Sequence, residues 1–189
     1  LMIAYSATLR GTMNKYYKSA WQRNSKTEYY ALTQFQPTDA QTAMPCWDEP
    51  QLKVTWSITM ISWVETVNIS HMAAESEVAC LYPSLTILLP TLPKKDVKWK
   101  ITKFQETPPI LSYLVAFANG LCTLRDEGWS LFSFTIGFLG TPFELCHNDF
   151  LSATPDIIHQ GKFCLKVTAK CLPLYKKIFD IEHPLPKLD

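Results

Sequence analysis

Apolar and polar residues alternate along much of the chain, and a period of two predicts β-strands. In residues 52–63 the apolar side chains fall mainly on one face of an extended chain and the polar ones on the other. Residues 97–102 alternate in the same way, which predicts one packed face and one wetter face. Residues 113–124 and 129–138 are more uniformly apolar, as strands covered on both faces are. The pattern therefore predicts a mainly β protein.

The beginning of the chain has weaker strand patterns. Residues 1–9 alternate loosely and are predicted to form a first strand. Residues 16–21 and 29–35 are predicted to pair as a β-hairpin, because the polar residues 22–28 between them suit a turn.

A short helical element is predicted between two of these strands. Residues 38–43 can form one helical turn, with Thr38 or Asp39 as its cap, and Pro45 stops it. We expect no more than a single turn here.

The period changes towards the end of the chain. Apolar residues at steps of four, four, three and four predict one face of an amphipathic helix over residues 157–179; they are Phe163, Val167, Cys171, Leu174 and Ile178. Pro173 lies inside this pattern and is predicted to kink or divide the helix. Residues 180–189 contain Pro184 and Pro186 and are predicted to be extended. We place a domain boundary at this change, giving residues 1–154 and 155–189.

Composition and charge narrow the class of protein. The 189 residues are 47% hydrophobic and 19% charged, which is typical of a globular chain. The net charge of +1 gives no electrostatic footprint for nucleic acid or for an anionic membrane. The six cysteines show no C-x-x-C pair, and their even number permits disulfides. Because the chain opens without a charged n-region and cleavage site, we expect free thiols in a reducing, cytoplasmic compartment instead. Without a secretory signal, we expect the Asn-Ile-Ser sequence that begins at Asn68 to be an accidental glycosylation sequon.

Three blocks of the chain are similar, in order, to the puromycin-sensitive and alanyl aminopeptidases. Residues 33–50 read T-Q-F-Q-P-T-D-A-Q-T-A-M-P-C-W-D-E-P, close to the family's T-Q-F-E-x-T-D-A-R-R-A-F-P-C-W-D-E-P. Residues 103–120 resemble the family's strand ending in S-T-Y-L-x-A-F-x-x-G. Residues 152–189 resemble the stretch that runs through Q-G-x-F-A-L to P-L-P-K-L-D.

The resemblance implies a β-sandwich or saddle-shaped domain over residues 1–154, beside a thermolysin-like zinc domain that removes amino-terminal residues from peptides. Residues 155–189 would be the opening helix and strand of that catalytic domain. The family's G-A-M-E-N and H-E-x-x-H motifs, which anchor substrate and hold zinc, do not occur in this sequence. We therefore expect a truncated chain that has no cofactor of its own and is inert alone. Its expected partners are peptide amino termini and the missing catalytic domain.

The same resemblance assigns a substrate-binding role to two residues. In the family, Gln and Glu of T-Q-F-E help to bind the free α-amino group of the substrate. Gln34 carries over directly, whereas Gln36 keeps an acceptor but lacks the negative charge. A charge-assisted hydrogen bond contributes about 1.5–3 kcal/mol against about 1 for a neutral one, so this pair should hold an ammonium less well. The alternative interpretation is that both are polar residues of an edge strand.

Other polar residues of the sequence fit structural roles better than chemical ones. Asp48 and Glu49 are adjacent, so on an extended segment they point to opposite sides and do not share a proton. Asp39 and Asp48 are expected to be turn and capping residues. No Cys and His spacing fits a zinc site, so no catalytic or metal-binding residue is assigned.

Two segments, residues 73–97 and 125–150, have no clear counterpart in the family. Each is either a divergent insertion or translated sequence that was never selected as protein. The alternative function is an independent, non-catalytic β-sandwich module that binds a protein or a ligand.

Overall fold

The computed structural model describes residues 1–12, 14–23, 25–80, 98–120, 134–135, 148–149 and 161–181. The chain forms two compact units, Leu1–Leu121 and Cys122–Asp189. The domain boundary predicted near residue 154 lies outside the described residues. Each unit is described by itself.

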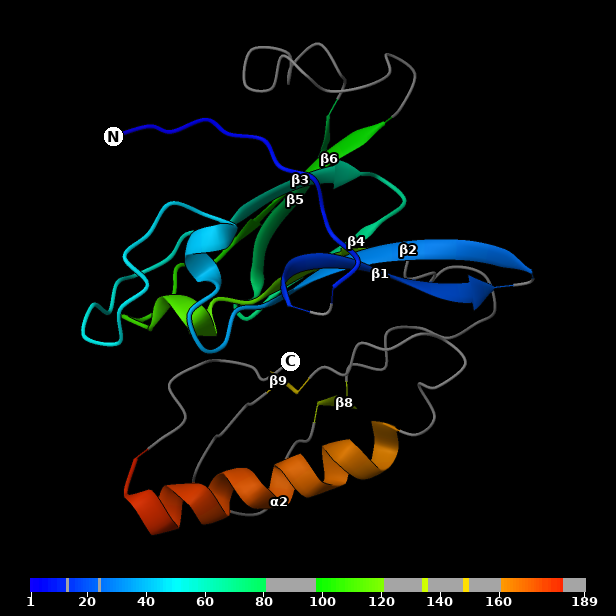
Figure 1. Cartoon of the computed structure of the whole chain (residues 1–189). Helices are drawn as coiled ribbons and strands as arrows, with labels where there is room; N and C mark the ends of the chain where they lie inside the picture. Colours follow the sequence, from blue (N-terminus) through cyan, green and yellow to red (C-terminus); the bar gives the residue numbers. More distant parts are fainter. Residues whose placement is uncertain are drawn as a thin grey trace. The chain divides into compact units, whose positions relative to one another are not determined.

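The first unit contains a four-stranded antiparallel sheet (Figure 1). Its strands lie in the order β1 (Lys15–Arg23), β2 (Lys26–Gln34), β7 (Phe117–Gly120) and β4 (Val67–Ser70). β1 and β2 form the predicted hairpin, with Lys15 opposite Gln34 at one end and Arg23 opposite Lys26 at the other. The hairpin prediction is confirmed, and the turn is shorter than predicted.

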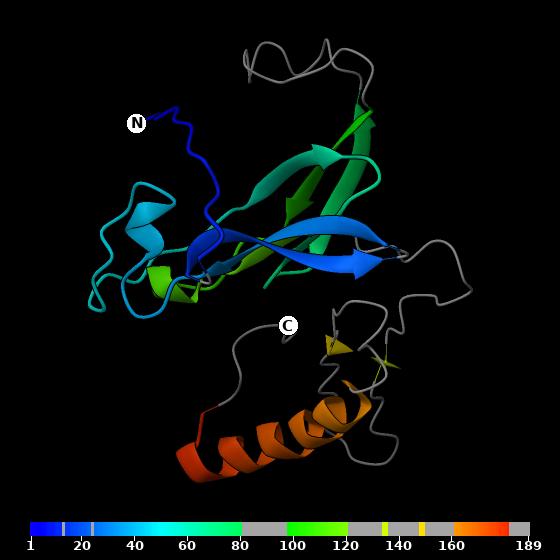
Figure 2. The same cartoon turned by 45° about the vertical axis from the view of Figure 1, so that its right-hand side comes forward.

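A three-stranded antiparallel sheet completes this unit. It places β6 (Trp99–Phe104) between β3 (Thr59–Trp63) and β5 (Ala74–Cys80). Figures 1 and 2 show that these strands run in a different direction from the β1–β2 hairpin. Two antiparallel sheets and a carboxyl-terminal helix confirm the mainly β fold predicted from the sequence.

The strand predicted over residues 52–63 is only partly confirmed. Its last part is β3, but before it the structure has a single bridge between Val54 and Ile110. The amide of Trp56 donates to the side-chain hydroxyl of Thr107 instead of to a backbone carbonyl (2.9 Å). The segment opposite contains Pro108 and Pro109, which have no backbone N–H and so cannot continue a ladder.

Two further strand predictions need correction. Residues 1–9 form no strand, and the side chains of Leu1, Met2, Ile3 and Tyr5 are exposed. In residues 113–124, the short 3-10 helix η2 (Ser112–Leu114) precedes β7, and residues 121–124 lie outside the described part. An apolar run does not distinguish a buried turn from a buried strand, which is why the sequence alone predicted a strand here.

The hydrophobic core of the first unit lies beside the four-stranded sheet. Phe35, Ala40, Ile110 and Val115 are buried together, and partly buried side chains pack against them. The ring of Phe35 meets that of Phe117 edge to face at 6.1 Å. This cluster joins the hairpin to the segments around η2.

A polar layer joins the two sheets. The buried amide of Asn68 on β4 donates to Ser62 Oγ on β3 (2.9 Å) and to Thr102 Oγ1 on β6 (2.8 Å). Its carbonyl oxygen accepts a hydrogen bond from Asn119 on β7 (2.7 Å). Because this amide is buried and bonded on both sides, the folded chain cannot present Asn68 for glycosylation.

The polar layer between the sheets also includes residues from the face of 97–102 that was predicted to be wetter. Lys98 is exposed, but Lys100 and Thr102 are buried, at 7% and 1% exposure, so the prediction of a wetter face was wrong for these two residues. Both donate to the carboxylate of Glu77 on β5, at 3.0 and 2.8 Å. Desolvation by itself would raise the pKa of Glu77, but these hydrogen bonds and the charge of Lys100 lower it. The central position of β6 buries polar side chains that found partners on the neighbouring strands.

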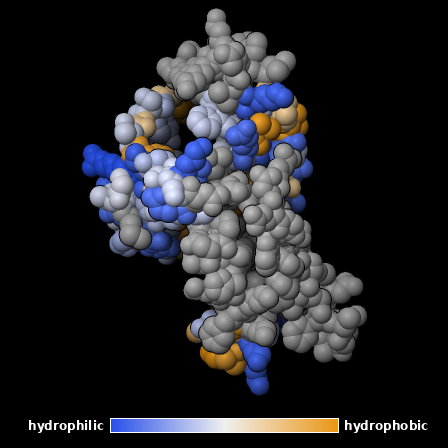
Figure 3. Space-filling view, turned by 90° about the vertical axis from the view of Figure 1, so that its right-hand side faces the viewer, coloured by the Kyte–Doolittle hydropathy of each residue, from blue (hydrophilic) through white to orange (hydrophobic). Residues whose placement is uncertain are grey.

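The second unit contains β8 (Phe134–Thr135), β9 (Asn148–Asp149) and the helix α2 (Gly161–Phe179). The predicted helix is confirmed, and Pro173 lies inside it without dividing it. Val167, Leu174 and Ile178 are exposed. Figure 3 shows apolar and hydrophilic side chains together at the carboxyl-terminal end of this helix. Among the described residues, no helix has the length and apolar character needed to cross a bilayer.

Candidate substrate-binding site

The two glutamines assigned from the sequence lie on either side of a core residue. Gln34 ends β2, and Gln36 follows Phe35. Phe35 is 1% exposed, whereas both glutamines are exposed. Because side chains alternate along an extended chain, the burial of Phe35 directs Gln34 and Gln36 to the same outer side. The core therefore positions the candidate site.

The structure brings these two side chains into direct contact. Gln34 Nε2 donates a hydrogen bond to Gln36 Oε1 at 2.7 Å. This leaves the Gln34 carbonyl oxygen, and the second lone pair of the Gln36 oxygen, as acceptors. An alkylammonium group has three donors and requires such oxygens, so the pair has suitable chemistry for an amine.

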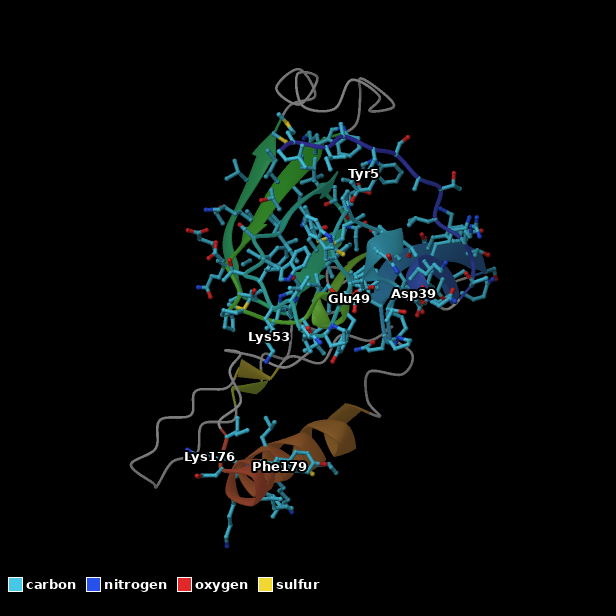
Figure 4. The ribbon with its side chains drawn as sticks, turned by 60° about the vertical axis from the view of Figure 1, so that its left-hand side comes forward. Tyr5, Asp39, Glu49, Lys53, Lys176 and Phe179 are labelled. Atoms are coloured by element: carbon cyan, nitrogen blue, oxygen red, sulfur yellow. The ribbon has the colours of Figure 1, made fainter. Side chains whose placement is uncertain are left out.

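Lys15 and Asp39 lie next to the glutamine pair. Lys15 is directly opposite Gln34 in the β1–β2 register, and its Nζ is 3.9 Å from Asp39 Oδ1. The amide of Asp39 donates to the carbonyl of Phe35 (2.8 Å), which closes a turn around Gln36. In Figure 4, Asp39 is labelled where the η1 segment meets the start of the hairpin. Sequence reasoning missed Lys15, because only the strand register brings it to this turn.

The predicted helical turn is confirmed as the 3-10 helix η1 (Ala40–Thr42), and Asp39, one of the two predicted caps, occupies its N-cap position. The side chain of Asp39 makes no capping bond. Instead, Asp48 Oδ2 accepts hydrogen bonds from the amides of Ala40 (2.9 Å) and Gln41 (3.4 Å). The capping role expected for Asp48 is therefore confirmed, at a distance in sequence that local cap rules do not cover.

The neighbours of Asp48 point elsewhere. Glu49 is exposed, so the two carboxylates do not form a pair, as the sequence predicted. Trp47 is 81% exposed, although it is the largest side chain of the block. Burial, and secondly the charge of Asp48, raise the pKa of the Cys46 thiol. Cys46 is a free thiol with no activating cation in the contacts described here.

The described residues do not fit a zinc site. In the described ranges, no group of three or more His, Cys, Asp or Glu side chains converges on one point. His71 is bonded through Nδ1 to the backbone of Ala116, at 3.0–3.1 Å, which holds it in the sheet. No chemical step is therefore derived through a metal held by these residues.

Comparison with known proteins shows similarity to the amino-terminal part of several aminopeptidases. The peptidase M1 N-terminal domain family matches residues 1–114. The chain is 34% identical over 189 residues to aminopeptidase M1-A of Oryza sativa subsp. japonica, covering all of this chain and 18% of that protein. It is 31% identical over 189 residues to aminopeptidase M1 of Arabidopsis thaliana, again with 100% and 18% covered. It is 31% identical over 191 residues to the mitochondrial aminopeptidase 2 of Saccharomyces cerevisiae, with 100% and 17% covered.

The family match covers more than half of the chain and contains both glutamines, η1 and most of both sheets. The chain itself spans less than a fifth of the length of these relatives. On these grounds the chain belongs to the peptidase M1 N-terminal domain family.

Proposed function

We propose that this chain is the amino-terminal part of a zinc aminopeptidase, where it forms one wall of the active-site cleft and binds the free amino group of the peptide. The observation that carries the proposal is the hydrogen bond between Gln34 and Gln36, which holds two amide groups together on the outer side of Phe35. The buried ring of Phe35 anchors the backbone between the two glutamines.

The chemistry of the pair fits a substrate amine better than a carboxylate or a phosphate. The amide oxygens accept hydrogen bonds from an ammonium group, and one of the two Nε2 hydrogens of Gln34 is already donated to Gln36. Neither side chain carries a positive charge that would attract an anion. A neutral pair binds an ammonium less strongly than a pair with a carboxylate. The expected consequence is a high KM for the amine-bearing substrate.

Cleavage itself is proposed to need the rest of an aminopeptidase. The sequence has neither H-E-x-x-H nor G-A-M-E-N, so it lacks the residues that would hold zinc and activate water in this family. When bound there, zinc supplies Lewis acidity and a nucleophilic water. This chain contributes the recognition of the amine and is inert alone.

An apolar surface supports a role beside another domain. Trp47, Leu52, Val54 and Leu114 are all exposed. They lie on two segments that meet at the Val54–Ile110 bridge and at the contact between Ser112 and Asp48. An independent binding module is the alternative use of the same surface, with a ligand in place of a domain.

The proposal is tested in a whole enzyme. Residues 1–114 of this chain replace the matching part of rice aminopeptidase M1-A, and hydrolysis of an alanyl substrate is measured. In this chimera Gln34→Ala is expected to raise KM about fivefold with little change in kcat, because a neutral hydrogen bond of about 1 kcal/mol is lost. Gln22→Ala, whose amide bonds Thr27 at the other end of the hairpin, is the matched control.

Thermal unfolding of both variants checks that the chimera is folded. A folded Gln34→Ala chimera with the KM of its parent contradicts the proposal.

A further inference from the structure

A set of contacts, the last of them through the backbone of Phe35, links four residues around the candidate site. Gln36 bonds Gln34 at 2.7 Å, and Gln34 lies opposite Lys15 in the hairpin. Lys15 is 3.9 Å from Asp39, whose amide bonds the carbonyl of Phe35 between the two glutamines. The carboxylate of Asp39 is thus held on the same turn that presents Gln36.

The ion pair in this set is weakly held. Its Nζ–Oδ1 separation of 3.9 Å is at the outer limit for a salt bridge, and the two side chains are 40% and 26% exposed. Exposed ion pairs of this geometry are screened by water and contribute little to the stability of the fold. A second cation can therefore exchange with Lys15 at Asp39.

The backbone of Lys15 has an unusual conformation for its residue type. Its φ is 72°, in the left-handed region, where lysine is uncommon. Such conformations persist only where the surrounding structure holds them, and they are concentrated at functional sites. Here the conformation lies at the first residue of β1, opposite Gln34.

We propose that Asp39 supplies the negative charge for the substrate amine that Gln36 lacks, and that the ammonium group of Lys15 occupies this place when no peptide is bound. This inference rests on the proposed function of the glutamine pair. The arriving α-ammonium would bind Gln34 and Asp39 together and displace Lys15 from the carboxylate. No covalent bond is made or broken in this exchange. Asp39 is a binding residue, and Lys15 competes with the ligand.

The test uses the whole chain, labelled with nitrogen-15, and the dipeptide Ala-Ala as the probe. The side-chain amide signals of Gln34 and Gln36 are followed by NMR during titration, and N-acetyl-Ala-Ala is the control ligand without an amine. We expect Ala-Ala to shift both signals and N-acetyl-Ala-Ala to leave them unchanged. Asp39→Asn should weaken binding about fivefold, as a charge-assisted bond becomes a neutral one.

Substitutions of Lys15 show whether this residue competes with the ligand amine for Asp39 or supports the structure of the site. Lys15→Met should tighten binding about threefold or more, because the competing charge is gone, whereas Lys15→Arg should bind as the parent does. Glu49→Gln removes an exposed carboxylate from the same block, outside this set of contacts, and should leave affinity within about twofold. An equal loss in Asp39→Asn and Glu49→Gln would show general attraction and overturn the role of Asp39.

Other outcomes distinguish a failure of this inference from a failure of the proposed function. If Gln34→Ala weakens binding but the Asp39 and Lys15 variants bind as the parent does, the glutamines alone hold the amine and this inference is wrong. If Lys15→Met weakens binding, Lys15 supports the site and does not compete. If the acetylated and free dipeptides shift the signals equally, the amine is not recognised and the proposed function itself fails.

Discussion

Ser112 donates its hydroxyl hydrogen to Asp48 Oδ1, and this contact joins residues that are 64 positions apart in the chain. The other oxygen of Asp48 caps η1. A single buried carboxylate therefore connects the P-C-W-D-E-P segment to both the turn after Gln36 and the segment of η2. The shape of the candidate site depends on this carboxylate.

Replacement of Asp48 should destabilise the first unit. Asp48→Ala leaves the buried amide of Ala40 and the hydroxyl of Ser112 without their acceptor, at a cost of about 1–3 kcal/mol for each unsatisfied group. Urea unfolding measures the loss. Ser112→Ala, which removes one donor and leaves the cap, should cost clearly less, and equal losses would contradict the capping role.

Gly120 should not tolerate a side chain. It lies between Tyr30 and Val67 in the sheet, and a Cβ at this position would be 2.5 Å from Tyr30 Cβ. We expect Gly120→Ala to lower the free energy of unfolding by about 1–3 kcal/mol through overpacking. Gly11→Ala is the matched control, because nothing lies within 4 Å of its added Cβ. Similar stabilities of the two variants would rule out the close packing.

The polar layer should be needed to hold the two sheets together. Asn68→Ala removes the partner of Ser62, Thr102 and Asn119, and should destabilise the chain by about 2 kcal/mol or more. Asn14→Ala, at an exposed position, should change stability by less than about 0.5 kcal/mol. Chemical denaturation of both variants compares them. Near-equal values would show that the layer contributes nothing.

Stability should fall in acid through Glu77. Its pKa is lowered in the folded state, from a model-peptide value of 4.5, so the unfolded state binds a proton first as the pH falls. The contribution of Glu77 is therefore complete above pH 4.5 and is lost as the pH falls from 4.5 through the folded pKa. Glu77→Gln should be less stable than the parent at pH 7, and the difference between their free energies of unfolding should disappear in this acid range. A stability difference that does not change with pH would exclude Glu77 as the cause of the acid destabilisation.

The exposed apolar residues of α2 should promote self-association of the isolated chain. Val167, Leu174 and Ile178 are exposed, and each such side chain contributes about 1.5–3 kcal/mol when fully buried. Light scattering after gel filtration should show oligomers, with fewer in Leu174→Asp than in the control Lys170→Asp. A monomeric parent chain would contradict this prediction.

The sequence by itself determined the class of fold, the hairpin, the single turn of η1 and the amphipathic helix. These features depend on local physics: alternation over two residues, a period near four, and prolines that stop helices. It also singled out Gln34 and Gln36 through the resemblance. Their role in binding an amine stays a prediction.

Tertiary structure alone decided which polar residues are buried and what they touch. Lys100 looked solvent-facing because lysine usually is, but β6 became a central strand and Glu77 compensated its charge. Likewise, no local rule predicts that Asp48 caps a turn eight residues before it, or that Lys15 reaches Asp39. Such contacts depend on strand order and register, which many distant residues fix together and which no single window of sequence contains.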